Sequence, residues 1–189
     1  MVQVSLAQPD QGALKTRDGI LLFFNADANA FTLNLPGDAD ISQYPFIKLN
    51  NDWFQFFIAD QSEFGSDDSE ALSSFMKWEL DFHSKELDAE IKYKSEPLLR
   101  NGVNMNFWKF SYPNLDLPAG ITAVKSNYFL DVVNKNKLLR FNYASASGDD
   151  AEARLILFRL SEGLQFYRER IDLSKLQQAL MSGDDHYKE

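Results

Sequence analysis

The sequence predicts an α+β fold in which amphipathic helices pack on an antiparallel β-sheet. Segments with the alternating apolar pattern of strands are joined by short turns, which implies antiparallel pairing. Two longer segments, 68–87 and 150–167, carry apolar residues at helical spacing. The predicted architecture is therefore an antiparallel meander with one amphipathic helix between two groups of strands. The second helix closes the sheet near the C-terminus.

The first group of strands precedes the first helix. Residues 20–24 form an apolar run of strand length, and alternating apolar residues over 31–35 predict a half-buried strand. Two short apolar segments, 46–49 and 53–59, flank a polar turn and predict a hairpin. The polar segment 1–18 is expected to be a loop or a loosely attached strand.

The first helix has a recognisable start. Asp67 is placed as its N-cap, and Glu70 follows three residues later, as in a capping box. Leu72, Phe75 and Leu80 belong to its apolar stripe, and Trp78 and Phe82 widen that stripe. An apolar face of this width must be covered by a sheet or bind another molecule.

The second group of strands contains the clearest turn signal in the chain. Asn101 and Gly102 can both adopt positive φ, as a type I′ hairpin turn requires. Strands with alternating apolar residues are then expected over 124–132 and 139–143. Asp149 and Glu152 have capping-box spacing at the start of the second helix, and a short helix is expected over 173–181.

Length and composition limit the domain organisation and the chemistry. The chain has 189 residues, no cysteine and two histidines, His83 and His186. A chain of this length can build one core without disulfides. We therefore expect an extension over 1–18, a single domain over 19–170, and a helix with a polar tail over 171–189. Thiolate chemistry and a zinc site with several histidine ligands are excluded within one chain, and no cofactor or metal is expected.

The negative charge is concentrated in the first half of the chain. The net charge is −9, with 5 basic and 15 acidic residues up to position 89 and 14 basic and 13 acidic residues after it. Overall acidity argues against a protein dedicated to binding the nucleic-acid backbone. No apolar run approaches the roughly 20 residues of a membrane helix. The chain as written has no complete signal peptide, which predicts a cytoplasmic location, or an extracytoplasmic one if a leader has been removed.

The order of elements resembles the PsbP-like superfamily, which includes the Ran guanine-nucleotide release factor. A strand pair at 30–35 and 53–59, the helix at 68–87, a meander with a central hairpin and the helix at 150–167 carry the resemblance. It covers roughly residues 31–167. The strand at 20–24 and the helix at 173–181 depart from that plan. The resemblance implies a mostly non-catalytic role as an accessory subunit, a partner of a small GTPase or a chaperone, and it assigns no site residues.

Two groups of residues are candidates for binding a partner protein. An acidic run before and at the start of the first helix would suit a basic partner, although acidic residues also stabilise a helix N-terminus. An aromatic strand follows the Asn-Gly turn and could form an exposed interface. The candidate partner-binding residues are Asp60, Glu63, Asp67, Asp68, Trp108, Phe110 and Tyr112.

Two other constellations have a plain structural explanation. His83 lies one helical turn from Glu79 and could act as a general base, but a boundary histidine with one hydrogen bond explains it better. Basic residues among the aromatic strands could bind single-stranded nucleic acid, but they are typical of the solvent face of a sheet. These basic residues are Lys92, Lys94, Lys109, Lys125 and Arg140.

Three functions follow from these observations. The first is a non-catalytic accessory or adaptor protein that binds another protein. The second is a carrier of a small apolar molecule or lipid in an aromatic pocket between sheet and helix. The third is a hydrolase that uses carboxylates alone, which would require two carboxylates facing one cleft.

Overall fold

The computed structural model describes residues 10–26, 29–43, 45–49, 52–111, 124–134 and 136–182. Its contacts divide the chain into two compact units, Met1–Ala39 with Glu162–Glu189, and Asp40–Ser161. These limits differ from the expected boundaries at 18 and 170. The physical reason is strand pairing, because strands from both ends of the chain join one sheet in the first unit.

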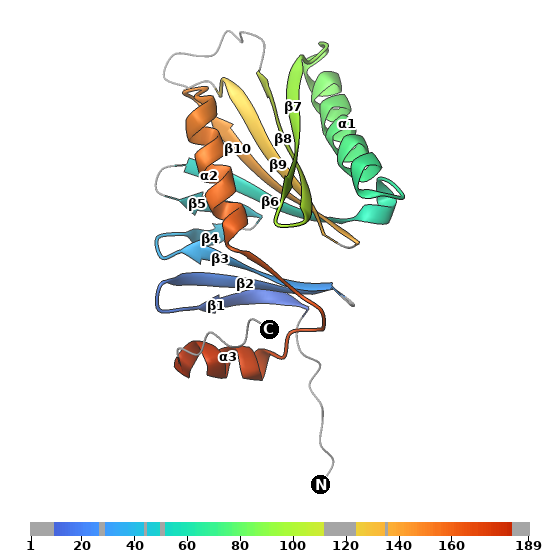
Figure 1. Ribbon diagram of the computed structural model, residues 1–189. Coiled ribbons are helices and arrows are strands. Elements are labelled where there is room, and N and C mark those ends of the chain that lie inside the picture. The colour runs from blue at the N-terminus through green and yellow to red at the C-terminus, as the bar shows by residue number, and fades with distance from the viewer. Residues whose placement is uncertain are drawn as a thin grey trace. The chain divides into compact units, whose positions relative to one another are not determined.

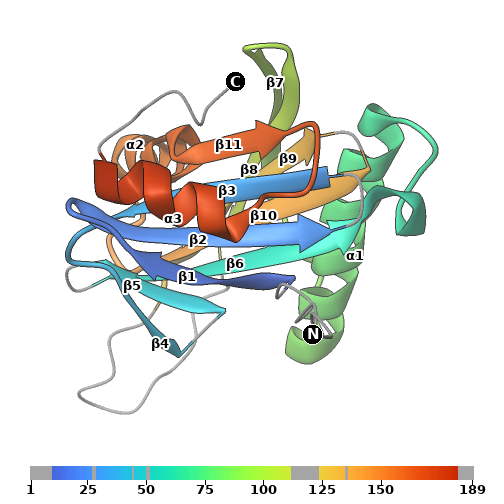
Figure 2. The same ribbon diagram turned by 90° about the horizontal axis from the view of Figure 1, so that it is seen from below.

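The first unit is a four-stranded antiparallel sheet with one helix. Its strands lie in the order β1-β2-β3-β11. Their bounds, with that of the helix, are β1 Gln11–Lys15, β2 Gly19–Ala26, β3 Asn29–Pro36, β11 Leu164–Tyr167 and α3 Leu173–Ser182. Helix α3 lies against this sheet (Figure 2), where Leu176 packs with Leu21 and Phe23. The segment before residue 18 thus contributes a paired strand.

The helix expected over 150–167 ends earlier than its apolar spacing predicts. Helix α2 spans Asp150–Glu162, and the next four-residue segment is strand β11, paired antiparallel with β3. Gly163 separates the two elements, and a Cβ atom there would lie 2.3 Å from the backbone oxygen of Asn34. Only glycine fits this close approach of two backbones, so the chain leaves the helix and joins the sheet.

The second unit is a seven-stranded antiparallel sheet in the order β4-β5-β6-β10-β9-β8-β7. The strand bounds are β4 Asp40–Gln43, β5 Phe46–Leu49, β6 Asp52–Asp60, β7 Tyr93–Arg100, β8 Val103–Ser111, β9 Ser126–Asn134 and β10 Lys137–Ser145. A 3-10 turn, Gln61–Glu63, leads from β6 to helix α1, Asp68–Leu87. The expected hairpins β5–β6 and β7–β8 are both present.

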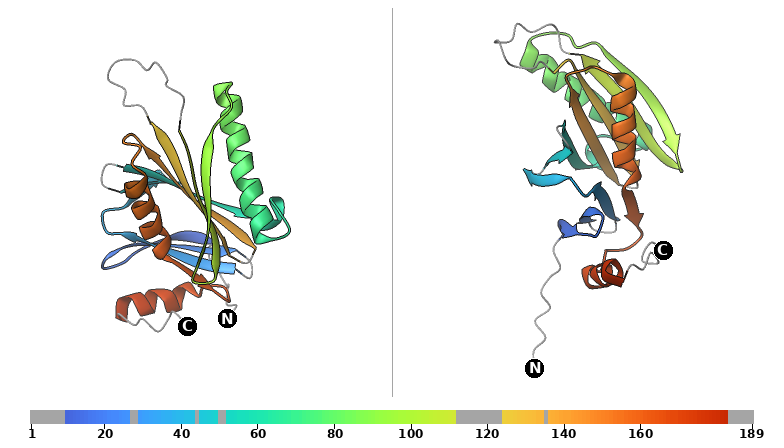
Figure 3. Two further views of the ribbon diagram at one scale, coloured as in Figure 1. Left: turned by 45° about the horizontal axis from the view of Figure 1, so that its top comes forward. Right: turned by 90° about the vertical axis from the view of Figure 1, so that its left-hand side faces the viewer.

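Helices α1 and α2 lie on opposite faces of this sheet (Figures 1 and 3). Alternate residues of β8 show the division. Trp108 and Phe110 pack with Met76 and Leu80 of α1, whereas Phe107 stacks on Phe158 of α2. Strand β8, whose odd- and even-numbered positions both carry apolar residues, is therefore buried on both faces of the sheet.

The N-terminus of α1 is capped as expected, with one change of partner. The Asp67 carboxylate accepts a hydrogen bond of 2.9 Å from the backbone N–H of Glu70. The Glu70 carboxylate accepts from the N–H of Ser66 at 2.7 Å and not from that of Asp67. In a standard capping box the glutamate accepts from the N–H of the N-cap residue, and here it accepts from the residue before the N-cap.

Candidate functional site

Helix α1 covers only part of its face of the seven-stranded sheet. It contacts β8 and β9, and a groove of about 690 Å³ lies beside it over β10 and β6. We call this depression the α1 groove. It belongs entirely to the second unit, and its walls come from α1, the 3-10 turn, β6, β9 and β10.

The rim of the α1 groove is aromatic and exposed. Trp78 and Phe82 of α1 are 55% and 51% exposed, and Phe57 of β6 is 39% exposed. Val124 adds an exposed aliphatic side chain on the rim. Large apolar side chains left in water beside a concave surface are typical of binding sites.

The apolar surface continues beyond the groove along the sheet. Every second residue of β6 faces α1, and Trp53, Gln55 and Phe57 belong to this set. Phe46 of β5 pairs with Gln55 across the two strands, so it lies on the same face. Trp53 and Phe46 are each 41% exposed. We call these two residues, with Phe57, Trp78, Phe82 and Val124, the aromatic patch.

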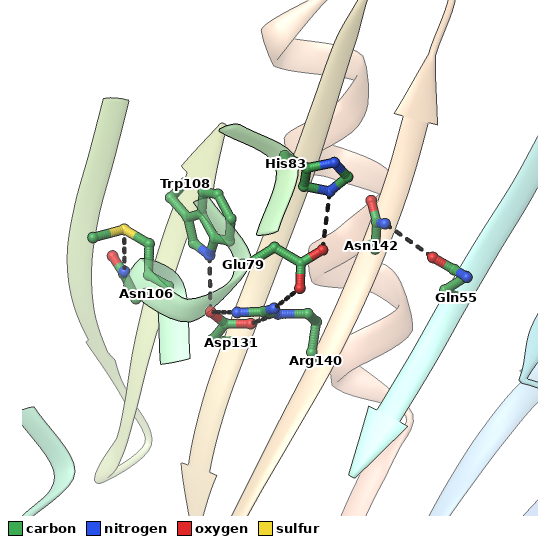
Figure 4. Close-up of polar contacts among 9 residues, drawn as sticks. Gln55, Glu79, His83, Asn106, Trp108, Asp131, Arg140 and Asn142 are labelled. Atoms are coloured by element: carbon green, nitrogen blue, oxygen red, sulfur yellow. Dashed lines mark hydrogen bonds and ion pairs between the residues drawn. The ribbon is translucent and has the colours of Figure 1, made fainter. Parts of the chain in front are cut away.

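A buried polar network forms the floor of the groove (Figure 4). The Arg140 Nε and one terminal nitrogen donate to the two oxygens of Asp131, at 2.6 and 2.8 Å. Its other terminal nitrogen donates to Glu79 at 2.7 Å. Trp108 Nε1 donates to Asp131 at 2.8 Å, and Glu79 contacts the His83 ring nitrogen at 3.1 Å. The network ties α1 to β8, β9 and β10.

The guanidinium of Arg140 is enclosed as well as paired. Arg140 and Asp131 are almost completely buried, and the Arg140 guanidinium lies 3.7 Å from the ring centroid of Phe75. A buried charge is tolerated when it is paired and hydrogen-bonded, and an aromatic face adds cation–π attraction. Arg140 is therefore a fixed part of the floor and not a free ligand-binding cation.

The carboxyl group of Glu79 is held in its charged form. Burial raises the pKa of Glu79, but the hydrogen bond from His83 and the charge of Arg140 outweigh this effect, so the pKa lies below its ordinary value. The network thus contains two carboxylates, Glu79 and Asp131, around one guanidinium. The His83 ring contacts the second oxygen of Glu79 and completes the network.

Side-chain amides complete the floor. Asn142 Nδ2 donates to Gln55 Oε1 at 3.1 Å, across the pair of strands β10 and β6. The Oδ1 atom of Asn142 is buried and accepts no hydrogen bond from the residues that the structure describes. Buried polar atoms normally have a partner, so this oxygen is a candidate acceptor for a bound molecule.

The four acidic candidates lie around the start of α1, and three of them have partners within the protein. Asp60 pairs with Lys137, and Asp67 caps α1. Asp68 accepts hydrogen bonds from Gln61 and Asn104, at 3.1 and 2.7 Å. Glu63 is exposed and, unlike the other three, lines the α1 groove.

The expectation of an exposed aromatic interface at Trp108 and Phe110 is corrected by the structure. Both side chains are almost completely buried, because α1 covers this part of β8. Tyr112 lies outside the described residues. Trp108 and Arg140, two of the basic and aromatic residues considered for nucleic-acid binding, are buried and do not offer a stacking surface.

The predicted proximity of His83 and Glu79 is confirmed, and the residues that complete the network were not predicted. Asp131 and Arg140 are opposite each other in the β9–β10 hairpin. In the sequence, each of the two lies between apolar residues, and each is three residues from the end of its strand at the β9–β10 turn. An acidic and a basic residue at equal distances from a hairpin turn are expected to face each other, and this pattern could have identified the pair.

Neither a metal centre nor a membrane helix is found in the part of the chain that the structure describes. No three or more of its His, Asp and Glu side chains are grouped as metal ligands would be. None of the helices described has the length and apolar character needed to cross a membrane.

Comparison with known proteins identifies the fold. No protein-family model and no curated protein matches this sequence. The solution structure of cyanobacterial PsbP from Synechocystis sp. PCC 6803 is similar, with a TM-score of 0.50 and 10% sequence identity, over 82% of this chain and 96% of that chain. The protein therefore has a PsbP-like α+β fold, as the order of its elements predicted.

Proposed function

We propose that this protein is a non-catalytic accessory protein that binds another protein through the α1 groove and the aromatic patch. The observation that carries the proposal is the patch itself. Six exposed apolar side chains from α1, β5, β6 and the residues before β9 gather on one side of one sheet. Among the residues that the structure describes, the five other large exposed apolar ones are in β7, α2 and α3. The likeness to cyanobacterial PsbP is compatible with an accessory role.

The bonding of Glu79 argues against a hydrolase that would use this residue as its general acid. Glu63 and Glu79 both line the groove, which is the arrangement that a carboxylate enzyme would need. A general acid in such an enzyme requires a raised pKa so that it carries a proton at neutral pH. The pKa of Glu79 is lowered, and both of its oxygens are bound by His83 and Arg140. Glu79 is thus suited to hold the network together and not to donate a proton.

A carrier of a small apolar molecule is the second candidate, because a volume of about 690 Å³ is in the range of small-molecule sites. A carrier would show a concentration-dependent rise in melting temperature with its ligand. The aromatic patch favours the protein partner, since Trp53 and Phe46 lie beyond the groove that a small molecule would fill.

Photo-crosslinking in the source cells tests the proposed surface. Benzoylphenylalanine in place of Trp78 would lie on the rim of the groove, and the same group in place of Leu155 would lie on the exposed side of α2. We expect one discrete crosslinked polypeptide from position 78 and none of that mass from position 155. Equal crosslinking at both positions, or none at position 78, would refute this surface.

A further inference from the structure

We infer that the segment of the partner that enters the α1 groove is basic and apolar, with an arginine or lysine side chain between apolar side chains. The inference rests on the proposed function and specifies the chemistry of its partner. It follows from the charge of the groove, from the hydrogen-bonding groups on its floor and from the aromatic rim.

The charge of the groove favours a cation. Glu63 and Glu79 line it together with His83, the hydrogen-bond partner of Glu79, and Arg140 is the only arginine or lysine among the described residues that line it. The Arg140 guanidinium already forms ion pairs with both Glu79 and Asp131. An anionic segment would therefore be repelled, and a cationic one would meet a complementary surface.

The polar floor offers acceptors to an incoming donor. Asn142 Oδ1 lacks a partner among the described side chains and backbone. Glu79 also lines the groove, and each of its carboxylate oxygens, already bound to His83 or Arg140, can accept a second hydrogen bond. The Arg140 side chain, the charged donor of the floor, already donates to Asp131 and Glu79. Arginine and lysine side chains carry only donors, so either would match this floor.

The aromatic rim suits both parts of such a segment. Rings of tryptophan and phenylalanine bind apolar side chains by contact and attract cations through their faces. The same side of the sheet already shows this attraction, because Lys48 lies over the ring of Trp53 with 5.7 Å between Nζ and the ring centroid. The long stem of an arginine or lysine would pack along Trp78 or Phe57 while its charged end reaches the acceptors.

The test is selection of random peptides displayed on phage against the immobilised, full-length protein. We expect enriched sequences with a basic residue between apolar residues. A synthetic peptide of the enriched sequence should bind less tightly as salt increases. Its affinity should fall by at least about tenfold in Trp78→Ser, because tryptophan is among the residues whose truncation most weakens an interface. In Glu63→Gln it should fall about threefold, as expected for one surface charge pair.

The control is Leu155→Ser, which removes an exposed apolar residue outside the groove and should leave binding unchanged. Enrichment of acidic or uncharged sequences, or no enrichment, would overturn the inference. So would affinity that is the same in Trp78→Ser as in the unchanged protein. The proposed function has its own test: it is refuted if photo-crosslinking from position 78 captures no partner, whatever the peptide selection gives.

Discussion

The residues beneath the α1 groove explain how charged side chains are tolerated in the buried part of an apolar sheet. Arg140 satisfies Asp131 on the neighbouring strand and Glu79 on α1, while Phe75 covers its guanidinium. Removing one partner from a buried pair leaves an uncompensated charge, which is far more costly than losing an exposed pair. The network should therefore be decisive for the stability of the unit that carries the groove.

Arg140→Met tests this role. We expect the free energy of unfolding to fall by about 3–5 kcal/mol, because the Asp131 carboxylate would stay buried without its partner. Urea denaturation measures the change. Lys77→Met, which removes one partner of the exposed pair with Asp81, is the control and should cost no more than about 1 kcal/mol. Similar losses in the two variants would contradict the role of the network.

Glu79 should make stability depend on pH in the acid range. Its pKa is below the ordinary value of 4.5, so its charged form stabilises the folded state above that value. This contribution is lost as the pH falls from 4.5 through the lower pKa of the folded state. Glu79→Gln should therefore flatten the pH dependence in this window. Unfolding free energies in urea over the acid range measure it.

Asp81→Asn, on the exposed side of the same helix, is the matched control for Glu79→Gln. It should retain the steeper acid dependence of the unchanged protein. An unaltered slope in Glu79→Gln would show that Glu79 does not supply this pH dependence.

At the scale of elements, the sequence predicted those whose signals are local. The Asp67 cap and the apolar stripe defined α1, and the Asn-Gly pair defined the β7–β8 turn. Strand β11 was missed because Leu160, Leu164 and Tyr167 have helical spacing even though the helix ends at Glu162. Pairing with β3 decides the conformation there, and such a long-range contact leaves little trace in a local pattern.

The turn between β7 and β8 gives a prediction at this scale. Asn101 and Gly102 have φ values of 53° and 74°, as a type I′ turn requires. Gly102→Val should lower the free energy of unfolding by more than about 1 kcal/mol, because a β-branched residue is strained at positive φ. A Cβ atom at this position would meet no described atom within 4 Å, so backbone strain and not a clash is the cause.

Thermal or urea denaturation of Gly102→Val measures that loss. Gly102→Asn is the control, because asparagine tolerates this backbone conformation and should cost less than valine. An unchanged melting temperature in Gly102→Val would contradict the turn assignment.

At the scale of the whole molecule, the candidate site was only partly predictable. The acidic first half and the broad apolar face of α1 pointed to this side of the protein. The choice of exposed aromatic residues was wrong for Trp108 and Phe110, because a sequence pattern does not show which part of a sheet a helix covers. The aromatic residues of the patch are instead on α1, β5 and β6, beside the area that α1 covers.

The most direct test of the protein-binding claim is native mass spectrometry of the protein purified gently from its own source. We predict a complex with a second polypeptide for the unchanged protein and for Leu155→Ser. We predict loss of that polypeptide in Phe57→Ser, which alters an exposed side chain of the patch. A bare chain, a small apolar adduct alone, or a complex retained in Phe57→Ser would contradict the claim that the aromatic patch binds a partner protein.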